Sequence, residues 1–233
     1  MYGDENGREV TQQIDWAMLD RCKYLGKKMK QILIINLLIL IGQTLITSIG
    51  WLAGRKLIPF TKLLFVIVII CSAVVIVCAI AYCVILVNMG AYYAAFGTSG
   101  ILMIVATLLS VWEEFNESAV LALLIALGTA VAEFFQMKYF VDGCESSLYG
   151  IDSGLVASWS TYWKIYVTIL VVGIVSTLCM IIPVINILAL IALLVVALVS
   201  VAIAIWMLIL INRTSDALTR RAVTLEYKGG VAS

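Results

Sequence analysis

The uncharged stretch from Leu63 to Trp112 decides the fold: LLFVIVIICSAVVIVCAIAYCVILVNMGAYYAAFGTSGILMIVATLLSVW. A second uncharged stretch runs from Ile165 to Asn212. A helix rises 1.5 Å per residue and the hydrocarbon core of a bilayer is ~30 Å thick, so about 20 residues cross it once. The stretches hold 50 and 48 residues, too many for one crossing and enough for two. Each stretch therefore predicts a membrane-buried helical hairpin.

Turn-forming residues near the middle of each stretch place the two fold points. The first is the tripeptide Asn88-Met89-Gly90, and the second is the segment from Pro183 to Asn186, where proline cannot donate a backbone hydrogen bond. With two further apolar segments, the chain predicts an all-α polytopic transmembrane helical bundle. A five-span arrangement, in which one segment re-enters the membrane, is the alternative. The six expected spans lie near 31–53, 63–87, 91–112, 118–138, 163–182 and 185–212.

The composition supports a membrane protein and disfavours an enzyme. Hydrophobic residues make up 64% of the chain and charged residues 12%, whereas a soluble domain has about 25% charged residues. The net charge of +1 gives no general attraction to nucleic acid, and the chain has no histidine, the commonest metal ligand and acid–base group. The sequence also lacks a P-loop, a dinucleotide fingerprint and the common hydrolase motifs. We expect no catalysis, no cofactor, no metal and no nucleic-acid partner.

The first 30 residues predict an amphipathic helix ahead of the first span. Apolar residues recur there at spacings of three and four, the pattern of one helix face. One interpretation is a helix that lies on the membrane surface, which is a common arrangement. The other is a docking helix for a cytosolic partner. The apolar face consists of Val10, Ile14, Met18, Cys22, Leu25 and Met29.

The distribution of lysine and arginine predicts that both termini are cytosolic. With six spans, 12 of the 15 basic residues lie on the side of the termini, all except Arg55, Lys56 and Lys62. Residues 213–233 then form a cytosolic tail. The brevity of the chain is our only reason for placing it in a bacterial cytoplasmic membrane.

Between the fourth and fifth spans, acidic residues and glycines predict a loop from Tyr139 to about Ser158. Aromatic residues then follow on one helix face, where rings commonly anchor a span at the level of the lipid headgroups. These residues are Trp159, Tyr162, Trp163 and Tyr166.

Glu133 is the one acidic residue inside an expected span. Charge is costly in hydrocarbon, so such a residue is a functional candidate, although it lies only five residues from Lys138 and the alternative is an interfacial position. The acidic connection between the third and fourth spans is a second candidate, as the outer mouth of a channel, because carboxylate rings select cations in oligomeric channels. The alternative is that it is an ordinary connection in contact with water. The candidate substrate or ion pathway comprises Glu133, Gln136, Gln43, Thr44, Thr47, Asn88 and Asn186, and the candidate mouth comprises Glu113, Glu114 and Glu117.

The order of spans suggests a function. Cut at the acidic connection, the six spans form two groups of three, the grouping of inverted-repeat transporters. Small-residue pairs such as Gly50 and Gly54 favour close helix packing or homo-oligomers. The first hypothesis is a small transporter or oligomeric channel. The alternative is a non-catalytic membrane subunit, scaffold or regulator, with a membrane or cytosolic protein as partner besides the lipid bilayer. A transporter needs converging polar groups and broken helices at the midplane, whereas a scaffold is dry there.

Overall fold

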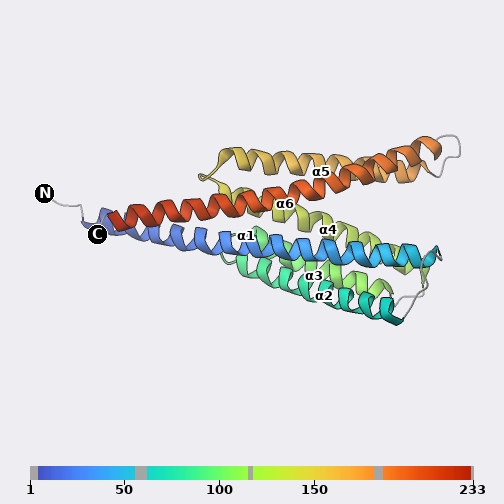
Figure 1. Cartoon of the computed structure of the whole chain (residues 1–233). Coiled ribbons are helices and arrows are strands. Elements are labelled where there is room, and N and C mark those ends of the chain that lie inside the picture. Colours follow the sequence, from blue (N-terminus) through green and yellow to red (C-terminus); the bar gives the residue numbers. More distant parts are fainter. Residues whose placement is uncertain (1–4, 56–61, 115–117, 181–185, 232–233) are drawn as a thin grey trace. The chain divides into compact units, whose positions relative to one another are not determined.

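The computed structural model describes residues 5–55, 62–114, 118–180 and 186–231. These residues form six helices and no strand (Figure 1). Each of the six helices is long and apolar enough to cross a membrane. The predicted all-α bundle is therefore confirmed, and the chain is an integral membrane protein. The helices are α1 (Glu5–Gly54), α2 (Lys62–Met89), α3 (Ala94–Glu114), α4 (Ala119–Leu148), α5 (Ser153–Cys179) and α6 (Asn186–Val231).

The first uncharged stretch folds as the predicted hairpin. Helix α2 packs against α3, and the turn between them begins directly after Met89. The backbone N–H of Gly90 donates to the carbonyl of Leu86 at 3.0 Å, and that of Tyr92 donates to the carbonyl of Met89 at 3.0 Å. The turn therefore lies at the end of the predicted tripeptide, where the absence of a Cβ on Gly90 lets the two helices approach.

The second uncharged stretch also contains two packed helices, α5 and α6. Helix α5 ends at Cys179 and α6 begins at Asn186, and the two helices lie side by side (Figure 1). Most of the predicted fold point, residues 183–185, lies outside the described residues.

The chain divides into two compact units. The central unit is Lys27–Phe140, and the C-terminal unit combines Met1–Gly26 with Val141–Ser233. The central unit thus holds most of α1 and α4 together with α2 and α3, while the C-terminal unit holds α5 and α6. This packing does not follow the three-plus-three grouping, which would divide the chain at the acidic connection.

Glycines bring helices together within the central unit. A Cβ added to Gly90 would lie 2.7 Å from the Cα of Gly97, and one added to Gly42 would lie 2.6 Å from a methyl group of Val75. Such contacts let helix backbones approach where no water drives association. In contrast, a Cβ on Gly50 or Gly54 would meet nothing within 4 Å, so this small-residue pair is unused within the described chain.

The predicted loop from Tyr139 to Ser158 is wrong. Helix α4 continues to Leu148 and α5 begins at Ser153, which leaves a short turn. Val141, Cys144 and Leu148 are buried, and their spacing of three and four places them on one face of a helix. Asp142 and Glu145 are only half-buried, which is compatible with an amphipathic extension of the span.

The turn between α4 and α5 has clear local signals. Gly150 has a φ of 74°, a conformation that glycine adopts without steric cost. Asp152 then caps α5, because its Oδ1 accepts a hydrogen bond of 2.9 Å from the backbone N–H of Leu155.

The predicted amphipathic segment before the first span is helical, but it is not a separate element. Helix α1 runs unbroken from Glu5 to Gly54 and contains no proline. A helix that lies on the membrane has to bend sharply before it enters a span, and sharp bends need a proline or a similar defect. Cys22 and Leu25 from the predicted apolar face are 2% and 0% exposed, so protein covers them rather than lipid.

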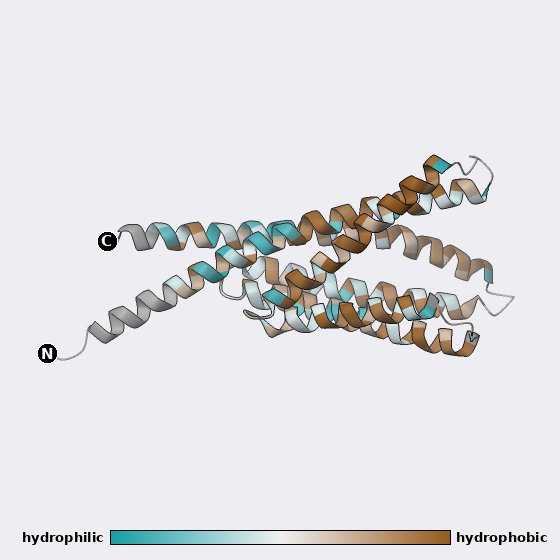
Figure 2. Cartoon of the chain, turned by 90° about the horizontal axis from the view of Figure 1, so that it is seen from below, coloured by the Kyte–Doolittle hydropathy of each residue, from teal (hydrophilic) through white to brown (hydrophobic). Residues whose placement is uncertain are grey.

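Helix α6 also continues past the membrane-spanning stretch, through the predicted tail. It is apolar over its first half and polar toward its C-terminal end, as Figure 2 shows. Ser215, Leu218, Ala222 and Leu225 are buried at spacings of three and four. The tail is therefore an amphipathic helix with one face packed against the rest of the C-terminal unit.

Candidate functional site

The predicted pathway residues on α1 and α4 do not converge. Glu133, Gln43, Thr44 and Thr47 are all exposed. Gln136 is half-buried, but it serves the packing of α3 on α4: its Nε2 lies 3.3 Å from Ser99 Oγ, which itself donates to the backbone carbonyl of Gln136 at 2.9 Å. Within the part of the chain that the structure describes, no hydrogen bond joins two of the seven predicted side chains.

The remaining predicted residues lie at helix ends. Asn88 is exposed near the end of α2, and Asn186 is exposed at the first position of α6. In the predicted acidic mouth, Glu113 is half-buried. The side chain of Glu114 and the whole of Glu117 lie outside the described residues.

Several hydroxyl groups in the spans bond to their own helices. Thr44 donates to the carbonyl of Leu40 at 2.7 Å, Thr129 to that of Ile125 at 3.0 Å, and Ser200 to that of Val196 at 2.8 Å. This bond to the residue four positions earlier satisfies a hydroxyl inside its own helix. These three hydroxyls therefore have a hydrogen-bond partner without a substrate, an ion or a neighbouring helix.

Asn36 on α1 is a polar residue that the sequence reasoning passed over. Its Nδ2 is buried and has no hydrogen-bond partner among the described residues. A buried amide of this kind calls for an explanation. The sequence did contain a signal for this position, because an asparagine within the first span is a polar residue in an apolar segment.

We define the polar end of the C-terminal unit as residues 16–26, 141–158 and 212–227. Helices α1 and α6 are in contact there. Ser215 Oγ donates to the carbonyl of Gly26 at 2.8 Å, and Lys23 Nζ lies 3.0 Å from Glu226 Oε1. A Cβ on Gly26 would lie 2.8 Å from Thr219 Oγ1. The two helices therefore cross closely at Gly26, with polar side chains across the contact.

The predicted aromatic anchor faces inward at two of its four positions. Trp159 and Tyr162 are 0% and 2% exposed. Trp159 Nε1 donates to Thr214 Oγ1 at 2.9 Å, and the Tyr162 ring packs edge-on against Trp206 at 5.7 Å. At Trp159 and Tyr162, α5 therefore uses this face to pack on α6 rather than to meet headgroups. Only Trp163 and Tyr166 are half-buried.

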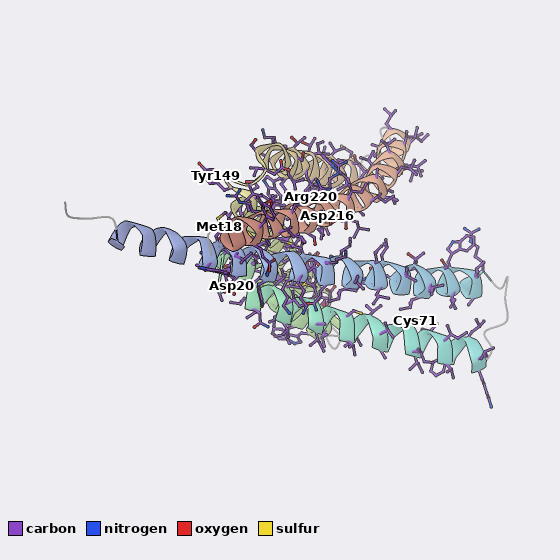
Figure 3. All side chains as sticks on the ribbon, turned by 60° about the vertical axis from the view of Figure 1, so that its left-hand side comes forward. Met18, Asp20, Cys71, Tyr149, Asp216 and Arg220 are labelled. Atoms are coloured by element: carbon purple, nitrogen blue, oxygen red, sulfur yellow. The ribbon has the colours of Figure 1, made fainter. Side chains whose placement is uncertain are left out.

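A cavity of about 610 Å³ lies between the start of α5 and the polar part of α6. Arg213, Arg220 and Arg221 line it from α6, together with Asp216 and with Asp152 from the turn before α5. Figure 3 shows Asp216 and Arg220 on the same part of α6. Sequence reasoning used these arginines only to orient the chain, so it missed that they share a helix face.

The described residues contain no group of three or more histidine, cysteine or acidic side chains that could hold a metal ion. No protein-family model matches the chain, and neither a curated protein nor a solved structure matches it. Composition and fold thus define the class of the protein, an integral membrane protein whose described residues form six apolar helices.

Proposed function

We propose that this protein is a non-catalytic membrane subunit or scaffold that holds a partner protein at the membrane. The observation that carries this proposal is the outward position of Glu133, Gln43, Thr44 and Thr47, which would have to converge in a transport pathway. Transporter sites are commonly built from interrupted helices near the midplane, whereas the helices here are continuous over their described lengths.

The packed helical extensions at the polar end support the same proposal. Helices α1 and α6 are 50 and 46 residues long, about twice the length that one crossing requires. The hydrogen bond between Ser215 and Gly26 holds α1 against α6 beyond the uncharged stretch. With both termini on the cytosolic side, as the basic residues favour, these extensions offer a rigid surface to a cytosolic or membrane partner.

The test compares the chain in its native membrane with the purified chain in liposomes. We expect the tagged protein, extracted in mild detergent, to migrate with a second polypeptide at fixed stoichiometry. Liposomes that contain the purified chain should be as impermeable to protons and potassium as empty liposomes. Migration of the chain alone, combined with ion flux through these liposomes, would contradict the proposal.

An oligomeric channel or small transporter is the second candidate, and the exposure of Glu133 favours it. Ala130, about one turn earlier on the same side of α4, is exposed as well, so the carboxyl group lies on an outward face of this helix. A charge at the centre of a bilayer costs about 3 kcal/mol by insertion measurements, which favours a second subunit or water over lipid beside it. If flux is found, Glu133→Gln should abolish it; unchanged flux in this variant would remove Glu133 from the pathway.

A further inference from the structure

We propose that the cavity at the polar end of the C-terminal unit binds a phosphate-bearing anion through Arg213, Arg220 and Arg221. This inference concerns a ligand site and does not depend on the proposed scaffold function. It rests on the placement of the three guanidinium groups, on their lack of carboxylate partners and on the position of the cavity along α6.

The three arginines share one face of α6. Arg213 and Arg220 are seven residues apart, which corresponds to two helical turns or about 10 Å along the axis, and Arg221 is the next residue. All three line the same cavity, which is large enough for a phosphate group with a substituent. Guanidinium groups present paired N–H donors whose geometry matches two oxygens of a phosphate.

The hydrogen bonds of the two carboxylates in the cavity go to groups other than these arginines. Asp152 accepts the capping hydrogen bond from the N–H of Leu155, and Asp216 Oδ2 lies 3.4 Å from Asn212 Nδ2. Within the described part of the chain, no salt bridge joins Arg213, Arg220 or Arg221 to a carboxylate. With three arginines and two aspartates among the lining residues, the cavity carries a formal charge of +1.

Arg221 gives a second indication of a ligand. Its Nε is buried and has no hydrogen-bond partner among the described residues. A buried donor without an acceptor is unfavourable, and the penalty is larger for a charged group. The Nε itself is closed to the cavity, so an anion would bind the terminal nitrogens of Arg221 and balance the charge of this side chain.

The position of the cavity defines two sources for the anion. Arg213 directly follows the uncharged stretch, so it lies near the headgroup level, while Arg220 and Arg221 lie about 10 Å further along α6. A phosphate group can therefore come from an anionic lipid headgroup or from a soluble phosphate compound. Both would present the same oxygens to the arginines.

The experiment titrates the purified full-length protein with two probes. Native mass spectrometry measures retention of phosphatidylglycerol, and a thermal shift measures binding of pyrophosphate. We expect the double variant Arg213→Gln/Arg220→Gln to weaken binding of at least one probe by about tenfold or more. Lys164→Gln, at an exposed position on α5 outside the cavity lining, is the control for general attraction of anions and should bind as the original chain does.

Asp216→Asn keeps the test independent of folding defects. This variant removes a negative charge from the cavity, so it should tighten binding several-fold, an effect that misfolding does not produce. Loss confined to the lipid arm identifies a headgroup, loss confined to the pyrophosphate arm identifies a soluble phosphate, and loss in both identifies a shared site. Failure of both probes to bind, or equal binding by the double variant and the original chain, would overturn the proposal.

Discussion

The two hairpins arise from uncharged stretches of nearly equal length, yet different contacts hold them together. In the α2–α3 hairpin, Gly90 and Gly97 bring the backbones into contact. In the α5–α6 hairpin, the indole of Trp159 bonds to Thr214 in a fully buried position. The length of an uncharged stretch therefore determines how many times the chain can cross the membrane, while a few residues at the hairpin ends decide how the helices pair.

The difference follows from where the pairing residues lie. The glycines lie at the turn of α2–α3, where small residues allow close backbone contact without polar groups. Thr214 lies two residues beyond the second uncharged stretch, at the beginning of the polar part of α6. A polar contact there links the membrane-spanning and polar parts of one helix pair.

Gly90→Leu should break the first hairpin and give the largest effect. The added Cβ would meet the Cα of Gly97 at 2.7 Å and the carbonyl of Val87 at 2.8 Å, and backbone atoms cannot rotate away. We expect the free energy of unfolding to fall by about 3 kcal/mol, measured by circular dichroism during detergent denaturation. Gly50→Leu, where a Cβ meets nothing within 4 Å, is the control. Equal unfolding curves for the two variants would refute the role of the glycine contact.

Trp159→Phe should weaken the second hairpin by about 2 kcal/mol, because it leaves the Thr214 hydroxyl buried without its donor and removes ring volume. A double-mutant cycle with Thr214→Val separates the hydrogen bond from the packing. We expect a coupling energy of about 1 kcal/mol in the same unfolding measurement. Strictly additive losses would show that the indole acts through volume alone.

Gly26→Ala should loosen the contact that α1 makes with this hairpin. The new Cβ would lie 2.8 Å from Thr219 Oγ1, but this atom belongs to a side chain and can move. The expected loss is therefore smaller, about 1 kcal/mol. Limited proteolysis of the N-terminal segment should detect it as faster cleavage. Thr219→Ala in the same chain removes the obstructing atom and should restore protection; if it does not, the crossing at Gly26 is not the cause.

Lys23→Ala should have almost no effect on the free energy of unfolding. The Lys23 and Glu226 side chains are 48% and 59% exposed, and an exposed ion pair contributes little because water and salt screen it. We expect a change below about 0.5 kcal/mol in the free energy of unfolding. A loss above about 1 kcal/mol would mean that the α1–α6 contact depends on charge rather than on close packing.

The hairpins were predictable because the length of an uncharged stretch can be compared with the thickness of the hydrocarbon core, and this signal is spread over many residues. The turn after Met89 was found from the one turn-like tripeptide in its region. The extension of α4 to Leu148 was missed because acidic residues and glycines were given more weight than the helical spacing of Val141 and Cys144. Charge on one face of a helix is compatible with a buried opposite face, so the spacing of the apolar residues decides between a loop and a helix.

The candidate pathway could not be derived in the same way. A span that is apolar on every side gives no signal for which face meets protein, so the exposure of Gln43 or Glu133 is not encoded in the local pattern. The cavity arginines, by contrast, were visible at a spacing of seven and eight residues. They were counted toward topology, and a helix drawn through residues 213–221 would have placed them together.

The uncharged α2–α3 hairpin has a consequence for biogenesis. Basic residues near span ends instruct the insertion machinery about orientation, and the turn after Met89 contains none. This hairpin therefore carries no orientation signal of its own between Leu63 and Trp112. Its direction has to be imposed by segments synthesised before and after it, and the basic residues nearest to its start are Lys62, Lys56 and Arg55.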